Sequence, residues 1–197
     1  SGDFFENDLR IAGGKPFLKR MDSPPGTSVA LVSKDTERTF ATHLGAAVEL
    51  KAEDMDPLEF RNFDILYLEG YLINNYLLTE TACKIAKESG MTIALDLASY
   101  NVVEEHLTSF RKITEKYVDI LFANEHEALK FTGFDPPKAL TVLSELCTIA
   151  VLKTGSEGSW IKSGNELIRI SAGQVKCVDT TGAGDLYAAG FLYGFAS

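Results

Sequence analysis

The 197-residue sequence holds only three cysteines, one tryptophan and six prolines, and no apolar run reaches the length of a membrane span. Cys83, Cys147 and Cys177 lie far apart and lack the short paired spacing of a zinc site or a disulfide framework. We interpret them as reduced thiols of the core. The first residues, SGDFFENDLR, are acidic and polar, unlike a signal peptide. We therefore expect a cytoplasmic protein with no membrane partner.

Positive charge is also scarce. The 19 lysines and arginines stand against 28 aspartates and glutamates, which gives a formal net charge of −9 at pH 7. This sign disfavours a phosphate-backbone partner, so we expect no nucleic acid. A small anionic ligand remains compatible, because backbone dipoles and a metal ion can make a local positive site. With 45% hydrophobic and 24% charged residues, the chain can form a sizeable core.

Two kinds of secondary structure are expected before residue 63. Residues 4–13 place apolar side chains among charged ones and predict a weak amphipathic helix that stops at Gly13 and Gly14. Residues 27–33 and 38–44 are rich in β-branched or aromatic residues and flank the polar KDTE. This pattern predicts a β-hairpin.

From residue 63 onward, short apolar runs alternate with helical patterns. The runs are apolar at consecutive positions, which is typical of parallel strands covered by helices on both faces. We therefore predict an α/β fold, a three-layer α/β/α sandwich with a mostly parallel central sheet. After Gly158, a Ser-Gly-Asn turn between two strand-like runs predicts an antiparallel excursion. The expected strands are 63–70, 91–98, 118–124 and 147–155, and the expected helices are 79–90, 103–116, 125–133 and 137–146.

Residues 178–195, VDTTGAGDLYAAGFLYGF, carry most of the chemical information. Val178 closes an expected strand, Gly182-Ala183-Gly184 allow a tight turn, and an apolar helix begins near Asp185. At such a turn, unpaired amides beside the positive end of the helix form an anion hole. These amides would stabilise a transferring phosphoryl group, and Asp185 is placed to take the proton from an attacking hydroxyl.

Other interpretations of the turn are weaker. If GAGD stood alone, the simpler interpretation would be that Asp185 interacts favourably with the helix dipole and that the glycines end a strand. Seven consecutive residues, 179–185, fit the phosphate-binding turn, which favours the functional interpretation. A Walker loop fails because neither Lys nor a hydroxyl residue follows Gly184. A dinucleotide fingerprint starting at Gly182 fails because Tyr187 occupies the position of its third glycine.

The run Asp179-Thr180-Thr181-Gly182-Ala183-Gly184-Asp185 resembles the C-terminal signature of the ribokinase-like (PfkB) family of sugar and nucleoside kinases. Residues 186–191 depart from the commoner small residue and Phe after the Asp, and are similar to bacterial adenosine-kinase-like members. The resemblance implies an ATP-dependent kinase with Asp185 as general base and residues 182–184 as its anion hole. It also implies an ATP contact at Thr180, and a K⁺ site at Asp179 and Thr181.

Two further motifs follow the family's order. Asn124-Glu125-His126-Glu127 resembles its Asn-x-x-Glu motif, which implies that Glu127 acts on Mg²⁺ through water while Asn124 faces the phosphates. The same residues could form only a helix cap. Lys153-Thr154-Gly155-Ser156-Glu157-Gly158 looks like the family's loop along ATP, with Gly155 and Gly158 permitting close approach. Lys153, where many relatives have Thr, would contact a phosphate or lie in solvent.

The remaining polar candidates have less support. Asp96 and the Glu69-Gly70 pair lie toward the carboxyl ends of expected strands, so they either line the cleft or are hydrated loop residues. His43, His106 and His126 show no metal spacing.

The resemblance also bears on the organisation of the chain. Arg38-Thr39-Phe40 matches a family element, so residues 15–44 are expected to contribute a β lid. This lid is also the expected surface for a homodimer. Residues 45–197 are expected to form the α/β core. The lid would exclude water from the phosphoryl donor. The family is longer at both ends, so residues 1–197 are expected to be an incomplete kinase domain that lacks the region gripping the acceptor.

The sequence leaves three functions open. The leading hypothesis is transfer of the ATP γ-phosphate to a primary hydroxyl of a sugar or nucleoside, with adenosine as the first acceptor to test. The alternatives are a ribose- or fructose-type sugar kinase, and a catalytically silent nucleotide-binding or dimerisation fragment. A NAD-binding oxidoreductase domain is disfavoured by Tyr187.

Overall fold

The structure is a computed structural model that describes residues 2–32, 38–175 and 179–197. The chain divides into two compact units, residues 1–55 and 56–197. The strand expected to close at Val178 lies outside the described residues.

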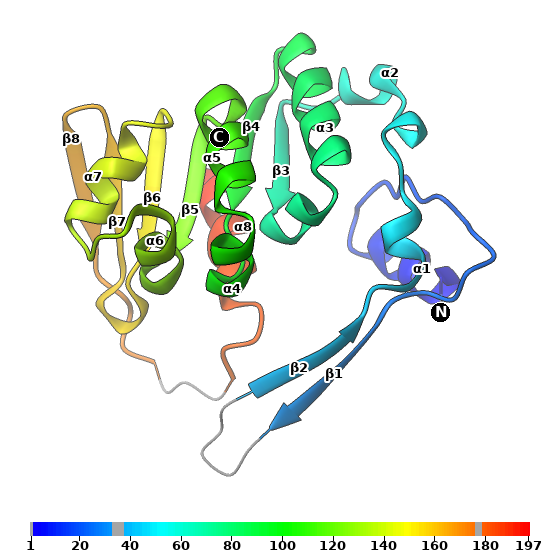
Figure 1. Cartoon of the computed structure of the whole chain (residues 1–197), viewed down its shortest axis with the longest axis horizontal. Coiled ribbons are helices and arrows are strands. Elements are labelled where there is room, and N and C mark those ends of the chain that lie inside the picture. The colour runs from blue at the N-terminus through cyan, green and yellow to red at the C-terminus, as the bar shows by residue number, and fades with distance from the viewer. Residues whose placement is uncertain (1, 33–37, 176–178) are drawn as a thin grey trace. The chain divides into compact units, whose positions relative to one another are not determined.

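The first unit contains the predicted helix and the predicted hairpin (Figure 1). The helix ends where glycine allows it: Gly13 has φ +88°, and the Gly14 amide donates to Leu9 O at 2.9 Å. The hairpin strands pair antiparallel from Thr27 opposite His43 to Val32 opposite Arg38, which confirms the predicted pairing. The elements are α1 (Gly2–Ile11), β1 (Thr27–Val32), β2 (Arg38–His43), η1 (Gly45–Glu49) and η2 (Ala52–Asp54).

The second unit is built on a six-stranded sheet with strand order β3-β4-β5-β6-β7-β8. Strands β3 to β6 are parallel, and β7 and β8 are antiparallel additions, so the mostly parallel sheet and the antiparallel excursion are both confirmed. The strands are β3 (Ile65–Glu69), β4 (Thr92–Asp96), β5 (Ile120–Asn124), β6 (Ile149–Lys153), β7 (Ser159–Ser163) and β8 (Glu166–Ile170).

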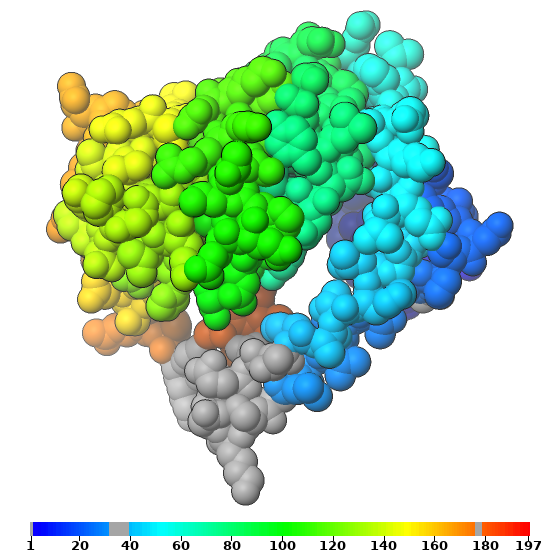
Figure 2. Space-filling view, in the orientation of Figure 1, coloured from blue at the N-terminus to red at the C-terminus, as the bar shows by residue number. Residues whose placement is uncertain are grey.

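Helices cover both faces of this sheet, as the three-layer prediction requires. Helices α3 to α7 pack on one face and α8 on the other, and Figure 2 shows the surface that α3 to α7 form over the strands. The helices are α2 (Pro57–Phe60), η3 (Gly70–Asn74), α3 (Tyr76–Glu88), α4 (Tyr100–Glu105), α5 (Leu107–Tyr117), α6 (Glu125–Thr132), α7 (Lys138–Ser144), η4 (Gly155–Glu157) and α8 (Ala183–Ala196).

The single helix predicted over residues 103–116 is wrong in one respect. The structure has two helices there, because His106 leaves the helical region with φ −117° and ψ 25°. Val103 before the break and Phe110 after it are both buried. Their apolar spacing therefore hides the break from a sequence pattern.

Alternate strand residues supply two hydrophobic clusters, one on each face of the sheet. The larger lies under α3 to α7 and includes Leu95 and Leu121, and the smaller includes Phe122 and Ala188 under α8. Cys83 and Cys147 are unpaired thiols, and burial raises the pKa of each to about 12. Cys177 lies outside the described residues. No helix within the described ranges is long and apolar enough to cross a membrane.

Candidate active site

Each of the four parallel strands ends in a polar or charged residue. Glu69, Asp96, Asn124 and Lys153 are the last residues of β3, β4, β5 and β6. Strand alternation places all four on the α8 face. The residues two positions earlier belong to the α8-side cluster (Ala94, Phe122 and Val151) or pack against it (Tyr67). The arrows of β3 and β5 in Figure 1 point to the end at which α8 begins. Carboxyl ends of parallel strands are where ligands bind in open α/β sheets.

The amino end of α8 has the turn geometry that was predicted for an anion hole. Gly182 is in the left-handed region (φ +74°) and precedes the helix, which begins at Ala183, two residues before the predicted start. The Ala183 amide donates to Thr180 O at 3.1 Å, and the first helical bond runs from Leu186 N to Gly182 O. Among the described residues, no backbone hydrogen bond runs from the Gly184 or Asp185 amide to a carbonyl one turn earlier, as is usual at a helix start.

Asp185 lies in the first turn of α8 with an exposed side chain. It is electrostatically coupled to Glu69 at the end of β3. An added Cβ on Gly182 would lie 3.8 Å from the Asp185 carboxylate, so this carboxylate leans back toward the turn. The structure thus brings a carboxylate to the rim of the helix amino end.

Lys153 does not lie in solvent at the strand end. Its Nζ donates to Asp96 Oδ2 at 2.6 Å, and the two side chains are 16% and 5% exposed. An added Cβ on Gly184 would lie 3.4 Å from the Lys153 ammonium, so this cation lies beside the amino end of α8. Asp96 is therefore a buried ion-pair partner, which rules out its interpretation as a hydrated loop residue.

Asn124 and Glu127 form a complete capping box at the start of α6. Glu127 N donates to Asn124 Oδ1 at 2.9 Å, while Asn124 N and Nδ2 donate to the Glu127 carboxylate at 2.8 and 2.6 Å. Burial raises the pKa of Glu127, although the bond from Asn124 N and the charge of Lys153 oppose this rise. The cap is present, and the Glu127 carboxylate keeps further lone pairs for a water ligand.

The two glycines of the 153–158 loop have different surroundings. An added Cβ on Gly155 would meet nothing within 4 Å, whereas one on Gly158 would overlap Ile170 O and lie 2.8 Å from Ala172 N. Both have positive φ, +56° and +104°. Gly158 is therefore required by its packing against the end of β8, independently of any ligand.

The predicted cation residues lie just before the α8 turn. Asp179 Oδ1 accepts a hydrogen bond from Thr181 N at 2.8 Å, and both side chains are exposed. Within the part of the chain that the structure describes, no group of three or more His, Cys, Asp or Glu residues could hold a metal ion.

Glu69 has an unusual protonation equilibrium for a carboxyl group. Burial raises its pKa from 4.5 to about 7, and the charges of Asp185 and Asp96 add to the rise while Lys153 opposes it. The folded state therefore binds this proton more tightly than the unfolded chain does.

We expect this proton to make stability depend on pH. The contribution of Glu69 is fully present below pH 4.5 and is lost as the pH rises through about 7. Glu69→Gln should flatten the fall in the free energy of unfolding over this window, measured by urea denaturation at several pH values. Glu166→Gln, on the exposed strand β8, is the control. Equal pH slopes for wild type and Glu69→Gln would contradict the prediction.

Tyr67 presents a hydroxyl that is buried without a hydrogen-bond partner among the described residues. Burial, followed by the charge of Asp96, raises the pKa of Tyr67. Tyr187 differs, because its hydroxyl hydrogen bonds to the buried Ser159 at 2.7 Å.

The two tyrosines should respond differently to loss of the hydroxyl. Tyr67→Phe should change the free energy of unfolding by less than about 0.5 kcal/mol or raise it, because no bond is lost. Tyr187→Phe should lower it by about 0.5–1.5 kcal/mol. Chemical denaturation compares them, and an equal loss in both variants would mean that the Tyr67 hydroxyl has a partner.

Comparison with known proteins identifies the family. The model of the pfkB family of carbohydrate kinases matches residues 1–197. The chain belongs to this family. The family that was predicted from residues 179–185 is thereby confirmed.

Individual relatives of this pfkB-family chain carry different names. An uncharacterized sugar kinase from Archaeoglobus fulgidus is 29% identical over 180 residues, which are 91% of this chain and 71% of that protein. Guanosine-inosine kinase from Escherichia coli is 28% identical over 127 residues, 61% of this chain and 29% of that one. The crystal structure of adenosine kinase from Sinorhizobium meliloti is 36% identical with a TM-score of 0.92, over 98% of this chain and 62% of that one.

Reasoning from sequence missed one residue and one contact of the candidate site in this pfkB-family chain. Tyr67 was not considered, and Asp96 was not joined to Lys153. Position at a strand end was the available signal for Asp96, but the pairing across β4 and β6 needs the strand order. For Tyr67, the signal was its position two residues before Glu69, which places both side chains on the same face of the strand.

Proposed function

We propose that this chain is part of an ATP-dependent kinase that transfers the γ-phosphate to a primary hydroxyl of a nucleoside or sugar. The observation that carries the proposal is the convergence of four polar strand ends with the amino end of α8, where Asp185 stands at the rim. This arrangement offers a base, fixed amides and a fixed cation at one edge of the sheet.

In the proposed step, Asp185 accepts the proton of the acceptor hydroxyl while the oxygen of that hydroxyl attacks the γ-phosphorus. The bond from this phosphorus to the bridging oxygen breaks, and ADP leaves with that electron pair. The Gly182-Ala183-Gly184 turn supplies amides to the transferring group. Since Ala183 N already donates to Thr180 O, the Gly182 and Gly184 amides have more capacity for this role.

The same residues fit the cofactors of this chemistry. Lys153, Gly155, Gly158 and Thr180 would lie along ATP, with Asn124 facing its phosphates. Mg²⁺ would neutralise phosphate charge, and Glu127 would hold its water ligands, since it has free lone pairs. Asp179 and Thr181 offer oxygens of the type that K⁺ binds, so this pair is the proposed monovalent site.

Adenosine is the acceptor that we propose first, because of the 36% identity to an adenosine kinase. A sugar such as ribose or fructose is the second candidate, because another relative is named a sugar kinase. The test incubates the whole protein with ATP, Mg²⁺ and each acceptor and detects the phosphorylated product. AMP from adenosine supports the proposal, a sugar phosphate shifts it to the second candidate, and ATP binding without any product favours a silent nucleotide-binding fragment.

We also propose that two copies associate through the hairpin β1–β2. Val29, Leu31 and Phe40 are each more than half exposed on it, and an isolated two-stranded hairpin is only marginally stable in water. Leu31→Lys should weaken the dimer at least about tenfold, measured by analytical ultracentrifugation. Leu167→Lys, on β8, is the control. A monomeric wild type, or an unchanged dimer in Leu31→Lys, would reject this interface.

A further inference from the structure

Asp96 is held from two sides at the end of β4. Its Oδ1 accepts a hydrogen bond from Ala98 N at 3.0 Å, and its Oδ2 accepts one from Lys153 Nζ at 2.6 Å. The side chain of Asp96 is 5% exposed. Its carboxylate therefore has a defined position and little contact with water.

The turn that follows Asp96 is strained. Ala98 has φ +62° and is the one non-glycine residue with positive φ in the described ranges. The Ser99 amide donates to Leu97 O at 2.7 Å, which tightens the turn. Strain of this kind persists where the surroundings enforce it, and it often accompanies function.

Gly70 packs directly against this turn. An added Cβ on Gly70 would lie 2.6 Å from Leu97 O and 2.7 Å from Asp96 O. The backbone after β3 thus presses on the backbone after β4. This contact limits the positions that the Asp96 turn can take.

Stability alone does not explain the Asp96–Lys153 pair. Burial of two charges carries a desolvation penalty that can exceed their attraction, so an apolar pair of similar volume is often as stable. The molecule has a second Lys–Asp ion pair that is accessible to solvent: Lys87 and Asp119 contact at 2.7 Å, and their side chains are 37% and 30% exposed. The buried pair differs because its ammonium lies against Gly184 at the amino end of α8.

We propose that Asp96 is a positioning residue, which fixes the Lys153 ammonium beside the α8 turn as a side-chain donor to the transferring phosphoryl group. The inference rests on the proposed phosphoryl transfer and adds Asp96 and its strained turn to that site. Lys153 has three N–H donors, of which one goes to Asp96. The other two are available for phosphate oxygens, and a donor held in place needs no reorganisation during the reaction.

Three variants of the whole protein test the positioning role by their kcat values. Lys153→Met should lower kcat about 10²-fold, the usual effect of removing one such donor. Asp96→Asn keeps the side-chain volume and should lower kcat about tenfold to 10²-fold through misplacement of the ammonium. Since Asp96 acts through Lys153, the double variant should match Lys153→Met. A kcat loss in the double variant equal to the product of the single losses, or a wild-type kcat in either single variant, would overturn the proposal.

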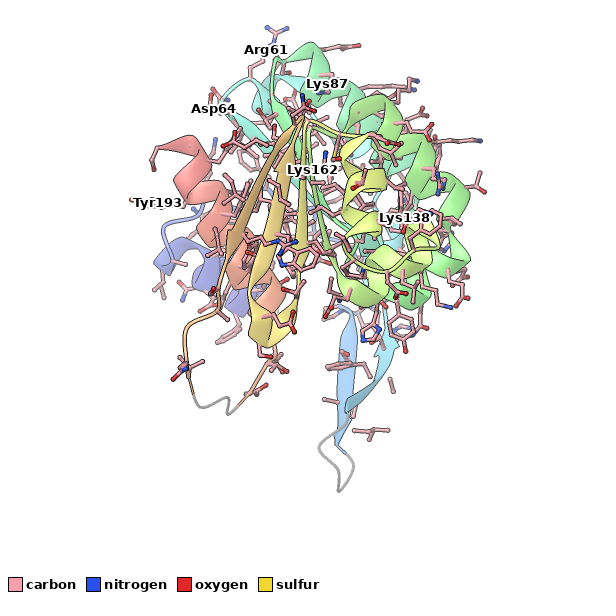
Figure 3. The ribbon with its side chains drawn as sticks, turned by 90° about the vertical axis from the view of Figure 1, so that its left-hand side faces the viewer. Arg61, Asp64, Lys87, Lys138, Lys162 and Tyr193 are labelled. Carbon is pink, nitrogen blue, oxygen red and sulfur yellow. The ribbon has the colours of Figure 1, made fainter. Side chains whose placement is uncertain are left out.

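Asp119→Asn is the matched control for Asp96→Asn. Asp119 also holds a lysine and a backbone amide, Lys87 Nζ at 2.7 Å and Ile93 N at 2.8 Å. Lys87 lies at the end of the sheet away from the start of α8 (Figure 3). Asp119→Asn should alter stability and leave kcat unchanged. An equal fall in kcat in the two variants would assign Asp96 a purely structural role.

Binding separates this inference from the kinase proposal. Calorimetry with a non-hydrolysable ATP analogue and Mg²⁺ needs no acceptor and no turnover. Lys153→Met should bind the analogue about tenfold or more weakly, because a charge-assisted hydrogen bond is lost. If wild type phosphorylates no acceptor but binds the analogue about tenfold or more tightly than Lys153→Met does, the kinase proposal fails and the Lys153 contact stands. Equal affinity in wild type and Lys153→Met would reject the contact.

Discussion

Replacing Asp185 by alanine is expected to lower kcat about 10²- to 10⁴-fold, the usual contribution of a general base. The carboxylate is in the first turn of α8, exposed at the rim of the helix amino end, so its loss should not disturb the core. The KM for ATP should change much less, because the proposed base acts on the acceptor hydroxyl. Steady-state kinetics of the whole protein with saturating acceptor measures both constants.

Asp64→Ala is the control for this variant. Asp64 is an exposed aspartate before β3, at the end of the sheet away from the start of α8 (Figure 3), and its loss should leave kcat unchanged. An Asp185→Ala enzyme with wild-type kcat would remove Asp185 from the role of base. Parallel losses in both variants would point to a general effect of charge.

Replacing Gly158 by alanine is expected to lower the free energy of unfolding by about 2–4 kcal/mol, through overpacking and backbone strain together. An added Cβ would overlap Ile170 O, and the φ of +104° is unfavourable for alanine. The overlapping atoms are backbone, so they cannot move away as a flexible side chain would. Urea denaturation of the whole protein measures the loss.

Gly155→Ala separates the two causes. Gly155 also has positive φ, +56°, but an added Cβ there meets nothing within 4 Å. Its replacement should lower the free energy of unfolding by only about 1–2 kcal/mol, the usual penalty for left-handed backbone. Equal losses in the two variants would show that the contact with β8 does not constrain Gly158.

Much of the fold could be predicted because local patterns decide it. The consecutive apolar runs of β4 to β6 are mostly buried, while the edge strand β3 is partly buried. The composition of these runs marks them as strands of a covered parallel sheet. The Ser-Gly-Asn turn predicted the β7–β8 hairpin, and Gly182 predicted the turn before α8. The break at His106 could not be predicted, since the apolar spacing continues through it.

The site was less predictable, since its contacts depend on strand order. Lys153 and Asp96 are 57 positions apart in the sequence, and they meet because β5 alone separates β4 from β6. Sequence reasoning left Lys153 between phosphate contact and solvent, and the structure replaces the solvent alternative with an ion pair to Asp96. The raised pKa of Glu69 likewise follows first from its burial and then from the charges of Asp185 on α8 and Asp96 on β4, which no local pattern joins to it.

The central claim is that phosphoryl transfer occurs where the α8 turn meets the ends of the parallel strands. It is tested most directly by a crystal structure of the whole protein with ADP, Mg²⁺, aluminium fluoride and adenosine. In this complex the aluminium fluoride group mimics the transferring phosphoryl group. We predict fluorine atoms about 3 Å from amides of the 182–184 turn, with the Asp185 carboxylate facing the acceptor hydroxyl. A well-bound nucleotide whose fluoride group lies away from this turn would contradict the claim.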